Sequence, residues 1–200
     1  GNTIYVWDYT RLKVKQKLPD YSFMTFLVDS GLWSGNYQYG LFRVLKDTIE
    51  VIKGGEAYKL KSIISVLPVN EQKKLIVTLN TGIYLYDNGN GTSVQYKFKD
   101  PTGFFNDNML YFSICLPDKN YAIGSTGDGF MVCNASGNEL SHISVSSGLN
   151  DFQVSNLYIN TRGPNVLIPL WATFFNGIGR FEFNSPFRQF TSTSGIDGSV

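Results

Sequence analysis

The sequence has few charged residues and no surplus of either sign. Asp, Glu, Lys and Arg make up 16% of its 200 residues, with 17 basic against 16 acidic side chains. A protein that binds nucleic acid needs basic residues clustered on one face to neutralise phosphates, so this balance argues against a nucleic-acid partner. Aromatic residues make up 15% of the chain, which argues against a disordered one.

Histidine, cysteine and long apolar runs are also scarce. His142 is the only histidine, which excludes a metal site built on paired histidines, and no Gly-x-Ser-x-Gly elbow accompanies it. Cys115 and Cys133 are too few for a disulfide framework or a zinc site. No apolar run approaches the roughly 20 residues that cross a bilayer. We therefore expect no cofactor and no metal, and membrane contact only through segments outside this chain.

The sequence does contain a repeat. Each of four segments has a short apolar strand, a loop of three or four residues, and a second strand opened by a glycine: 32–44, 75–86, 122–132 and 170–181. The opening glycines, Gly40, Gly82, Gly129 and Gly177, are separated by steps of 42, 47 and 48 residues. A period of about 40–50 residues is typical of propeller blades. This alignment places Ile76 and Ile123 where the other two units have Trp33 and Trp171.

Two further strands complete each unit. We expect the first strands over 23–28, 62–66, 110–115 and 155–159, and the fourth strands over 48–52, 94–98, 139–145 and 187–190. The range 58–67 also fits a short amphipathic helix, but its β-branched residues Ile63, Ile64 and Val66 favour a strand. Residues 3–7 and 12–18 resemble the last two strands of a preceding blade. The expected divisions are a half blade over 1–18 and blades over 19–57, 58–104, 105–148 and 149–200.

The prediction is therefore an all-β fold, a β-propeller segment of about four to four and a half four-stranded antiparallel blades. We expect it to be part of a larger ring, because seven blades of about 45 residues need roughly 315 residues. A segment of a ring exposes blade faces that are normally buried. We therefore expect chains to pair as a homodimer that covers them.

Two units carry a more specific resemblance. Leu32-Trp33-Ser34-Gly35 with Gly40-Leu41-Phe42-Arg43, and Leu170-Trp171-Ala172-Thr173 with Asn176–Phe181, resemble the two-component regulator propeller repeat. Ser147-Gly148-Leu149 and Ser194-Gly195-Ile196 resemble the Ser-Gly-Leu that recurs between blades of that family. The resemblance implies a non-catalytic, extracytoplasmic (periplasmic) sensor region of a membrane-bound bacterial regulator. Its partners would be the remaining blades, a downstream signalling module such as a histidine kinase, and a ligand, often a carbohydrate fragment.

The topology predicts where a ligand would bind. In a four-stranded blade, the loop between strands two and three lies on the same face as the connection to the next blade. On that face we expect aromatic rings to stack on sugars and amides to bind hydroxyls. The candidate ligand-binding residues are Asn36, Tyr37, Tyr39, Asn80, Asn106, Asp107, Asp128, Asn150, Asp151, Phe175 and Asn176.

Other readings of the same residues stay open. The candidates are also ordinary turn formers and aromatic wedges between blades, and their composition equally suits protein recognition by an interaction scaffold. An enzyme of the glycosidase or sialidase type would need converging carboxylates, for which Asp107, Asp128 and Asp151 are available. Fold alone does not choose among these functions, because propellers host many of them.

Overall fold

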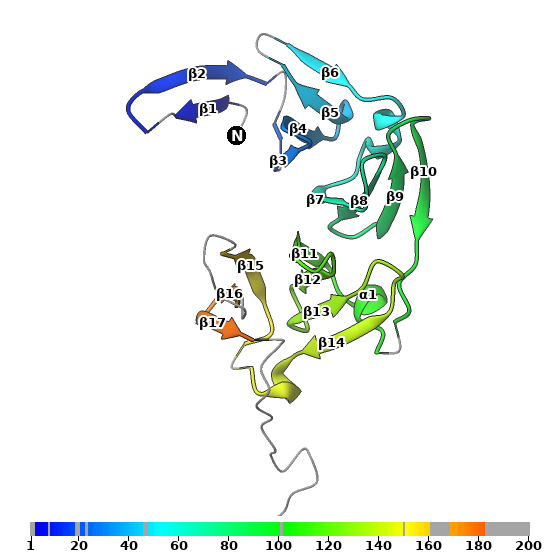
Figure 1. The fold of residues 1–200 in the computed structure, drawn as a ribbon, viewed down its shortest axis with the longest axis vertical. Helices are drawn as coiled ribbons and strands as arrows, with labels where there is room; N and C mark the ends of the chain where they lie inside the picture. The colour runs from blue at the N-terminus through cyan, green and yellow to red at the C-terminus, as the bar shows by residue number, and fades with distance from the viewer. Residues whose placement is uncertain are drawn as a thin grey trace, which may run out of the picture.

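The computed structural model describes residues 3–7, 9–18, 21–22, 24–45, 48–100, 102–149, 151–160 and 169–182. Within them, antiparallel sheets follow one another along the sequence and stand side by side in an arc around an open centre (Figure 1). The predicted all-β propeller architecture is confirmed. No helix in the described ranges is long and apolar enough to span a membrane.

The blades take their strands in sequence order. The first blade contains β3 (Thr25–Val28), β4 (Gly31–Asn36), β5 (Gly40–Val44) and β6 (Ile49–Val51). The second contains β7 (Ile63–Pro68), β8 (Lys73–Thr78), β9 (Ile83–Asp87) and β10 (Thr92–Tyr96), and the third β11 (Leu110–Cys115), β12 (Tyr121–Ser125), β13 (Phe130–Cys133) and β14 (Glu139–Ile143). The fourth blade has the described strands β15 (Val154–Ile159), β16 (Leu170–Phe174) and β17 (Gly177–Phe181), and β1 (Thr3–Trp7) pairs with β2 (Leu12–Lys17) ahead of the first blade.

The second half of the ambiguous range 58–67 is a strand as expected, since β7 begins at Ile63, whereas Tyr58 ends a short 3-10 helix. The sequence did not predict this helix, η1 (Gly55–Tyr58), which precedes β7. Two more short helices, α1 (Phe104–Asp107) and η2 (Val145–Ser147), also lie in connections between blades. The predicted strand over 187–190 lies outside the described residues.

The blades pack face to face through three apolar clusters, one for each pair of neighbouring blades. The second and third strands of the third blade, β12 and β13, are buried on both faces, since every residue in them is buried. The fourth strand faces solvent on one side, as the mixed burial of β10 illustrates. Continuous rather than alternating apolar strands are the expected consequence of covering both faces of a sheet.

The strand register corrects one part of the repeat alignment. Trp33 pairs with Arg43 and Trp171 with Arg180, in each case three residues after the opening glycine. In the second and third blades the residues at that register position are Leu75, which pairs with Leu85, and Ala122, which pairs with Val132. The expectation that Ile76 and Ile123 occupy the tryptophan position is therefore wrong. Each of them faces the preceding blade instead.

Three buried tyrosines link neighbouring elements through their hydroxyl groups. Tyr86 on β9 donates to the carbonyl oxygen of Lys53 at 2.9 Å, and Tyr121 on β12 donates to that of Pro68 in the second blade at 2.9 Å. Tyr58 in η1 shares a hydrogen bond with Ser93 on β10. Burial raises the pKa of Tyr121 to about 12 and also raises the pKa values of Tyr58 and Tyr86.

We expect these tyrosines to make the fold labile in alkali. An unfolded chain loses their protons near pH 10, whereas the folded chain keeps them, so the free energy of unfolding is steady below pH 10 and falls from there towards pH 12. Each tyrosine contributes a slope of about 1.4 kcal/mol per pH unit. Urea unfolding at pH 8, 10 and 11 measures the effect, and Tyr121→Phe should reduce the slope. Equal stability at pH 8 and pH 11 would show that the three hydroxyl groups ionise freely in the fold.

Candidate functional site: the junction of the second and third blades

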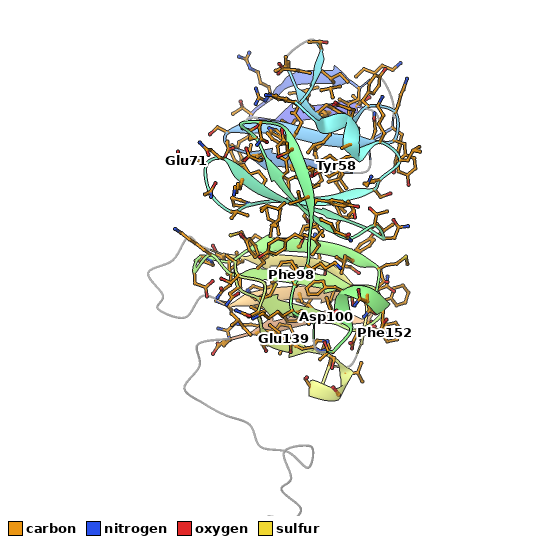
Figure 2. All side chains as sticks on the ribbon, turned by 90° about the vertical axis from the view of Figure 1, so that its right-hand side faces the viewer. Tyr58, Glu71, Phe98, Asp100, Glu139 and Phe152 are labelled. Atoms are coloured by element: carbon orange, nitrogen blue, oxygen red, sulfur yellow. The ribbon has the colours of Figure 1, made fainter. Side chains whose placement is uncertain are left out.

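The loops predicted to share one face do meet there. The loop after β4 accepts a hydrogen bond from the next connection, Leu60 N to Tyr37 O at 3.2 Å, and the loop after β8 does the same, Leu110 N to Leu79 O at 2.9 Å. Figure 2 shows Tyr58 and Phe152, from two connections between blades, on one side of the molecule, and Glu71, from a β7–β8 turn, on the other. We call the side with Tyr58 and Phe152 the loop face.

At the junction of the first and second blades, the candidate side chains bind to the fold itself. Asn36 is 4% exposed, and its Oδ1 accepts a hydrogen bond from the backbone N of Tyr39 at 2.8 Å. The hydroxyl group of Tyr37 pairs with Ser62 Oγ at 2.8 Å across the junction. The ring of Tyr39 packs edge-to-face on Phe42. These contacts give all three residues a structural role.

At the junction of the third and fourth blades, two of the five candidates, Asp128 and Asp151, also contact other residues of the fold. Asp128 Oδ2 lies 3.2 Å from His142 Nε2. Asp151 accepts hydrogen bonds from the backbone N atoms of Gln153 and Asn176, both at 3.1 Å. The side chains of Phe175 and Asn176 are exposed to solvent. Asn150 lies outside the described residues.

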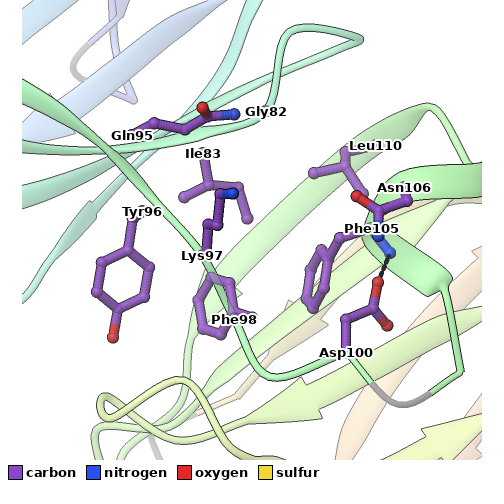
Figure 3. A pocket seen from close by; sticks show the side chains of 10 residues that line it. All are labelled: Gly82, Ile83, Gln95, Tyr96, Lys97, Phe98, Asp100, Phe105, Asn106 and Leu110. Atoms are coloured by element: carbon purple, nitrogen blue, oxygen red, sulfur yellow. Dashed lines mark hydrogen bonds between the residues drawn. The ribbon is translucent and has the colours of Figure 1, made fainter.

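The second and third blades meet at a hollow that contains the other three candidates. Asn80, Asn106 and Asp107 line a cavity of about 200 Å³, between the β8–β9 loop and α1. A second cavity of about 210 Å³ adjoins it on the side of β10 and shares the lining residues Gly82, Phe105, Asn106 and Leu110. We call the two together the second-junction groove. Figure 3 shows its β10 half.

The groove has an aromatic and aliphatic floor that the fold holds in place. Phe105 stacks on Phe98 with ring centroids 4.9 Å apart and an interplanar angle of 22°. The carboxylate of Asp100 accepts a hydrogen bond from Phe105 N at 2.8 Å, which fixes the start of α1 (Figure 3). Ile83 and Leu110 are both 3% exposed and complete the floor from β9 and β11. A preorganised floor of this kind loses little conformational entropy when a ligand binds.

The rim of the groove is polar and free to bind. The side chains of Asn80, Gln95, Lys97 and Asn106 are exposed, and none of them hydrogen-bonds to another described residue. Amides both donate and accept hydrogen bonds, and an ammonium group donates three. Polar groups around an apolar floor match the usual composition of small-molecule sites. The groove is therefore suited to a small ligand with an apolar face and several hydroxyl groups.

Sequence reasoning missed half of this rim. Gln95 and Lys97 fall in the range 94–98, which the sequence predicts as a fourth strand, and neither is among the candidate ligand-binding residues. The one available signal was the polar character of alternate residues in Ser93, Gln95 and Lys97, which indicates that one side of the strand faces solvent.

No protein-family profile matches the chain, and no curated protein matches it. Solved structures do. The WD40 β-propeller domain of Doa1 is similar with a TM-score of 0.68 and 11% identity, over 92% of this chain and 58% of that one. The extracellular domain of the hybrid two-component system BT3049 from B. thetaiotaomicron has a TM-score of 0.68 and 14% identity, over 93% of this chain and 24% of that one. The extracellular domain of the hybrid two-component system BT4673, from the same organism, has a TM-score of 0.62 and 18% identity, over 92% of this chain and 26% of that one.

These similarities establish the β-propeller fold. They include extracellular domains of two-component systems, the class that the repeat resembles. The chain spans about a quarter of the length of those two extracellular domains and somewhat more than half of the Doa1 domain.

Most of the side chains that could act in catalysis, the two thiols and the loop aspartates, are buried or already bound to other residues. Burial raises the pKa of the Cys133 thiol to about 12, with a smaller contribution from Glu139, and burial also raises that of Cys115. A thiol protonated at neutral pH is a poor nucleophile. Asp107 lies at the second junction, whereas Asp128 and Asp151 lie at the third and are bound there. Within the described ranges, no group of three or more His, Cys, Asp or Glu residues is placed to hold a metal ion.

Proposed function

We propose that this chain is the non-catalytic sensor region of a bacterial two-component regulator, outside the cytoplasm, and that its ligand binds in the second-junction groove. The observation that carries the proposal is the groove on the loop face, where unengaged Asn80, Gln95, Lys97 and Asn106 surround a fixed floor that includes Phe105. The choice of a sensor over a scaffold is supported by the repeat motifs that resemble the two-component regulator propeller, taken together with the similarity to extracellular domains of such systems.

The chemistry of the groove favours a carbohydrate fragment. A pyranose ring offers an apolar face that packs on aromatic or aliphatic side chains, and its hydroxyl groups pair with amides. The rim contributes three amides but only one ammonium group, from Lys97, while the carboxylate of Asp107 lies at the opposite end. This mixture suits a neutral or weakly charged oligosaccharide better than a phosphate or a polyanion.

The position of the groove suggests how binding would be relayed. Its walls come from two blades, β8–β10 on one side and α1 with β11 on the other. A ligand that contacts both walls favours the arrangement of blades in which both contacts form. The resulting bias on the downstream module can be no larger than the difference in the ligand's affinity for the two arrangements.

The test is a thermal-shift screen of neutral and acidic oligosaccharides, followed by titration calorimetry of those that raise the melting temperature. We expect Asn106→Ala and Gln95→Ala each to weaken binding by about 2- to 10-fold, as the loss of one hydrogen bond implies. Both residues are exposed, so the melting temperature of the free protein should change little.

The matched control is Asn176→Ala, an exposed asparagine on the same face at the third junction, which should leave affinity unchanged. Binding that depends on Asn176 rather than Asn106 would move the site to another junction. The screen should also be made on the protein joined to its natural neighbouring segments. If no oligosaccharide shifts the melting temperature of that protein, a carbohydrate-sensing function is excluded, and an interaction scaffold explains the fold better.

A further inference from the structure

Another cavity lies where the first strands of three consecutive blades come together. Its volume is about 430 Å³, which is larger than either half of the second-junction groove, and it shares no lining residue with that groove. Its walls are residues 24–27, four residues of β7 and two residues of β11. β3, β7 and β11 are the edges of their sheets that face the open centre of the arc (Figure 1). We call this hollow the inner cavity.

The lining of the inner cavity is apolar and uncharged. Phe26, Leu27 and Phe112 contribute aromatic and aliphatic surface, and Leu27 is 80% exposed. The described residues of this lining include no acidic, basic or amide side chain, and their only polar side chains are hydroxyl groups. A charged ligand would lose hydration there without gaining a counter-ion. A sugar would find few partners for its many hydroxyl groups, so the cavity is unsuited to the ligand class of the groove.

One buried polar group in the lining has no partner. Ser113 on β11 is 4% exposed, and its Oγ forms no hydrogen bond with any residue that the structure describes. The backbone of Ser113 is held in place by the second blade, because Ser65 Oγ accepts a hydrogen bond from Ser113 N and donates one to Ser113 O, both at 3.1 Å. An unpartnered buried hydroxyl group is rare in folded proteins. Ser113 therefore marks the point in the cavity where a polar group of a ligand would be held.

We infer that the inner cavity is a second binding site, and that its ligand is a neutral aromatic molecule with one hydroxyl group, of the phenol class. The ring packs on Phe26, Leu27 and Phe112, and the sulfur of Met24 adds a favourable contact with an aromatic edge. The hydroxyl group of the ligand pairs with Ser113 Oγ. An apolar lining with few placed polar groups, and a volume above about 300 Å³, are the usual properties of small-molecule sites.

The probe for this site is 2-naphthol, which is neutral at pH 7 like other phenols and is fluorescent. Fluorescence titration compares it with naphthalene, which has the same rings without the hydroxyl group, and with naphthalene-2-sulfonate, which is charged. We expect 2-naphthol and naphthalene to saturate the site and the sulfonate not to. Ser113→Ala should reduce the preference for 2-naphthol over naphthalene by about 2- to 10-fold, as the loss of one hydrogen bond implies. Its effect on the affinity for naphthalene should be small.

Leu27→Asp tests the location of the site. It removes apolar surface from the lining and places a charge there, so the affinity for both neutral probes should fall by about 5-fold or more. Because Leu27 is exposed, the melting temperature of the free protein should change little. The matched control is Leu140→Asp, since Leu140 is 53% exposed on the outer strand β14, and it should leave the affinity unchanged.

Three results would overturn the inference. One is the absence of saturable binding of 2-naphthol up to about 1 mM, the weak end of specific affinities. Another is binding that Leu27→Asp leaves unchanged, because the probe would then lie elsewhere. The third is a preference for 2-naphthol that survives Ser113→Ala, because Ser113 would then not recognise the hydroxyl group. Asn106→Ala in the second-junction groove should not affect 2-naphthol, so the outcome is separate from that of the carbohydrate screen.

Discussion

Trp33→Ala should lower the free energy of unfolding by about 3–5 kcal/mol, the usual range for deleting a large buried aromatic side chain. Trp33 is 1% exposed and fills the space between the first and second blades, where it meets Tyr86 edge-to-face and shares a cluster with Leu41 and Ile76. Alanine would leave a cavity between two sheets that cannot close without moving one blade relative to the other. Urea unfolding followed by far-ultraviolet circular dichroism measures the loss.

Leu27→Ala is the control for this substitution. Leu27 lies in the same blade, on β3, but is 80% exposed, so its truncation should cost less than about 0.5 kcal/mol. A cost for Trp33→Ala that is as small as the cost for Leu27→Ala would mean that the first and second blades do not pack as described.

Gly129→Ala should be at least as damaging as the loss of a core side chain, with an expected cost above about 3 kcal/mol. Gly129 opens β13 with a φ of +64°, a conformation that costs a non-glycine residue roughly 1–2 kcal/mol. An added Cβ would also lie 2.0 Å from the carbonyl oxygen of Ile143, so β14, the neighbouring strand of the same blade, would have to move. Thermal and urea unfolding both measure the effect.

Gly148→Ala separates these two causes. Gly148 also has a positive φ, +97°, but an added Cβ there would meet no atom within 4 Å. Its substitution should therefore cost only the conformational part, about 1–2 kcal/mol. Equal costs at the two positions would show that the close approach of Gly129 to Ile143 is not a constraint on the fold.

The sequence was enough to predict the architecture because the repeat is marked by its turns. Gly40, Gly82 and Gly129 have positive φ values, and each stands at the turn into the third strand of its blade. The period between them identified the blades without any reference to side-chain packing. The predicted strands 3–7 and 110–115 agree with β1 and β11 residue for residue.

The turn glycines locate the strands, but they do not indicate which side chains of a strand point towards the next blade. A run such as Leu75–Ile76–Val77 is buried on both sides, so no polar residue indicates which side chains face the next blade. A shift of one residue reverses the facing of a whole strand. The assignment of Ile76 and Ile123 to the tryptophan position failed for this reason.

The candidate site was predictable only as a face. Topology indicated which loops gather, but the partner of each polar side chain depends on atoms distant in sequence. Tyr37 meets Ser62, and Asp151 meets the backbone of Asn176, so neither is free, whereas Asn106 is. Composition alone does not distinguish these cases, because asparagine, aspartate and tyrosine serve equally well in turns and in binding sites.

Hydrogen exchange with and without a bound oligosaccharide tests the central claim most directly, since the ligand should protect the backbone that it covers. The account predicts slower exchange in peptides covering 79–83 and 95–110, the two walls of the second-junction groove, and no change in those covering 36–40. Protection confined to 36–40 or 174–177 would contradict it, as would binding that leaves exchange on the whole loop face unchanged.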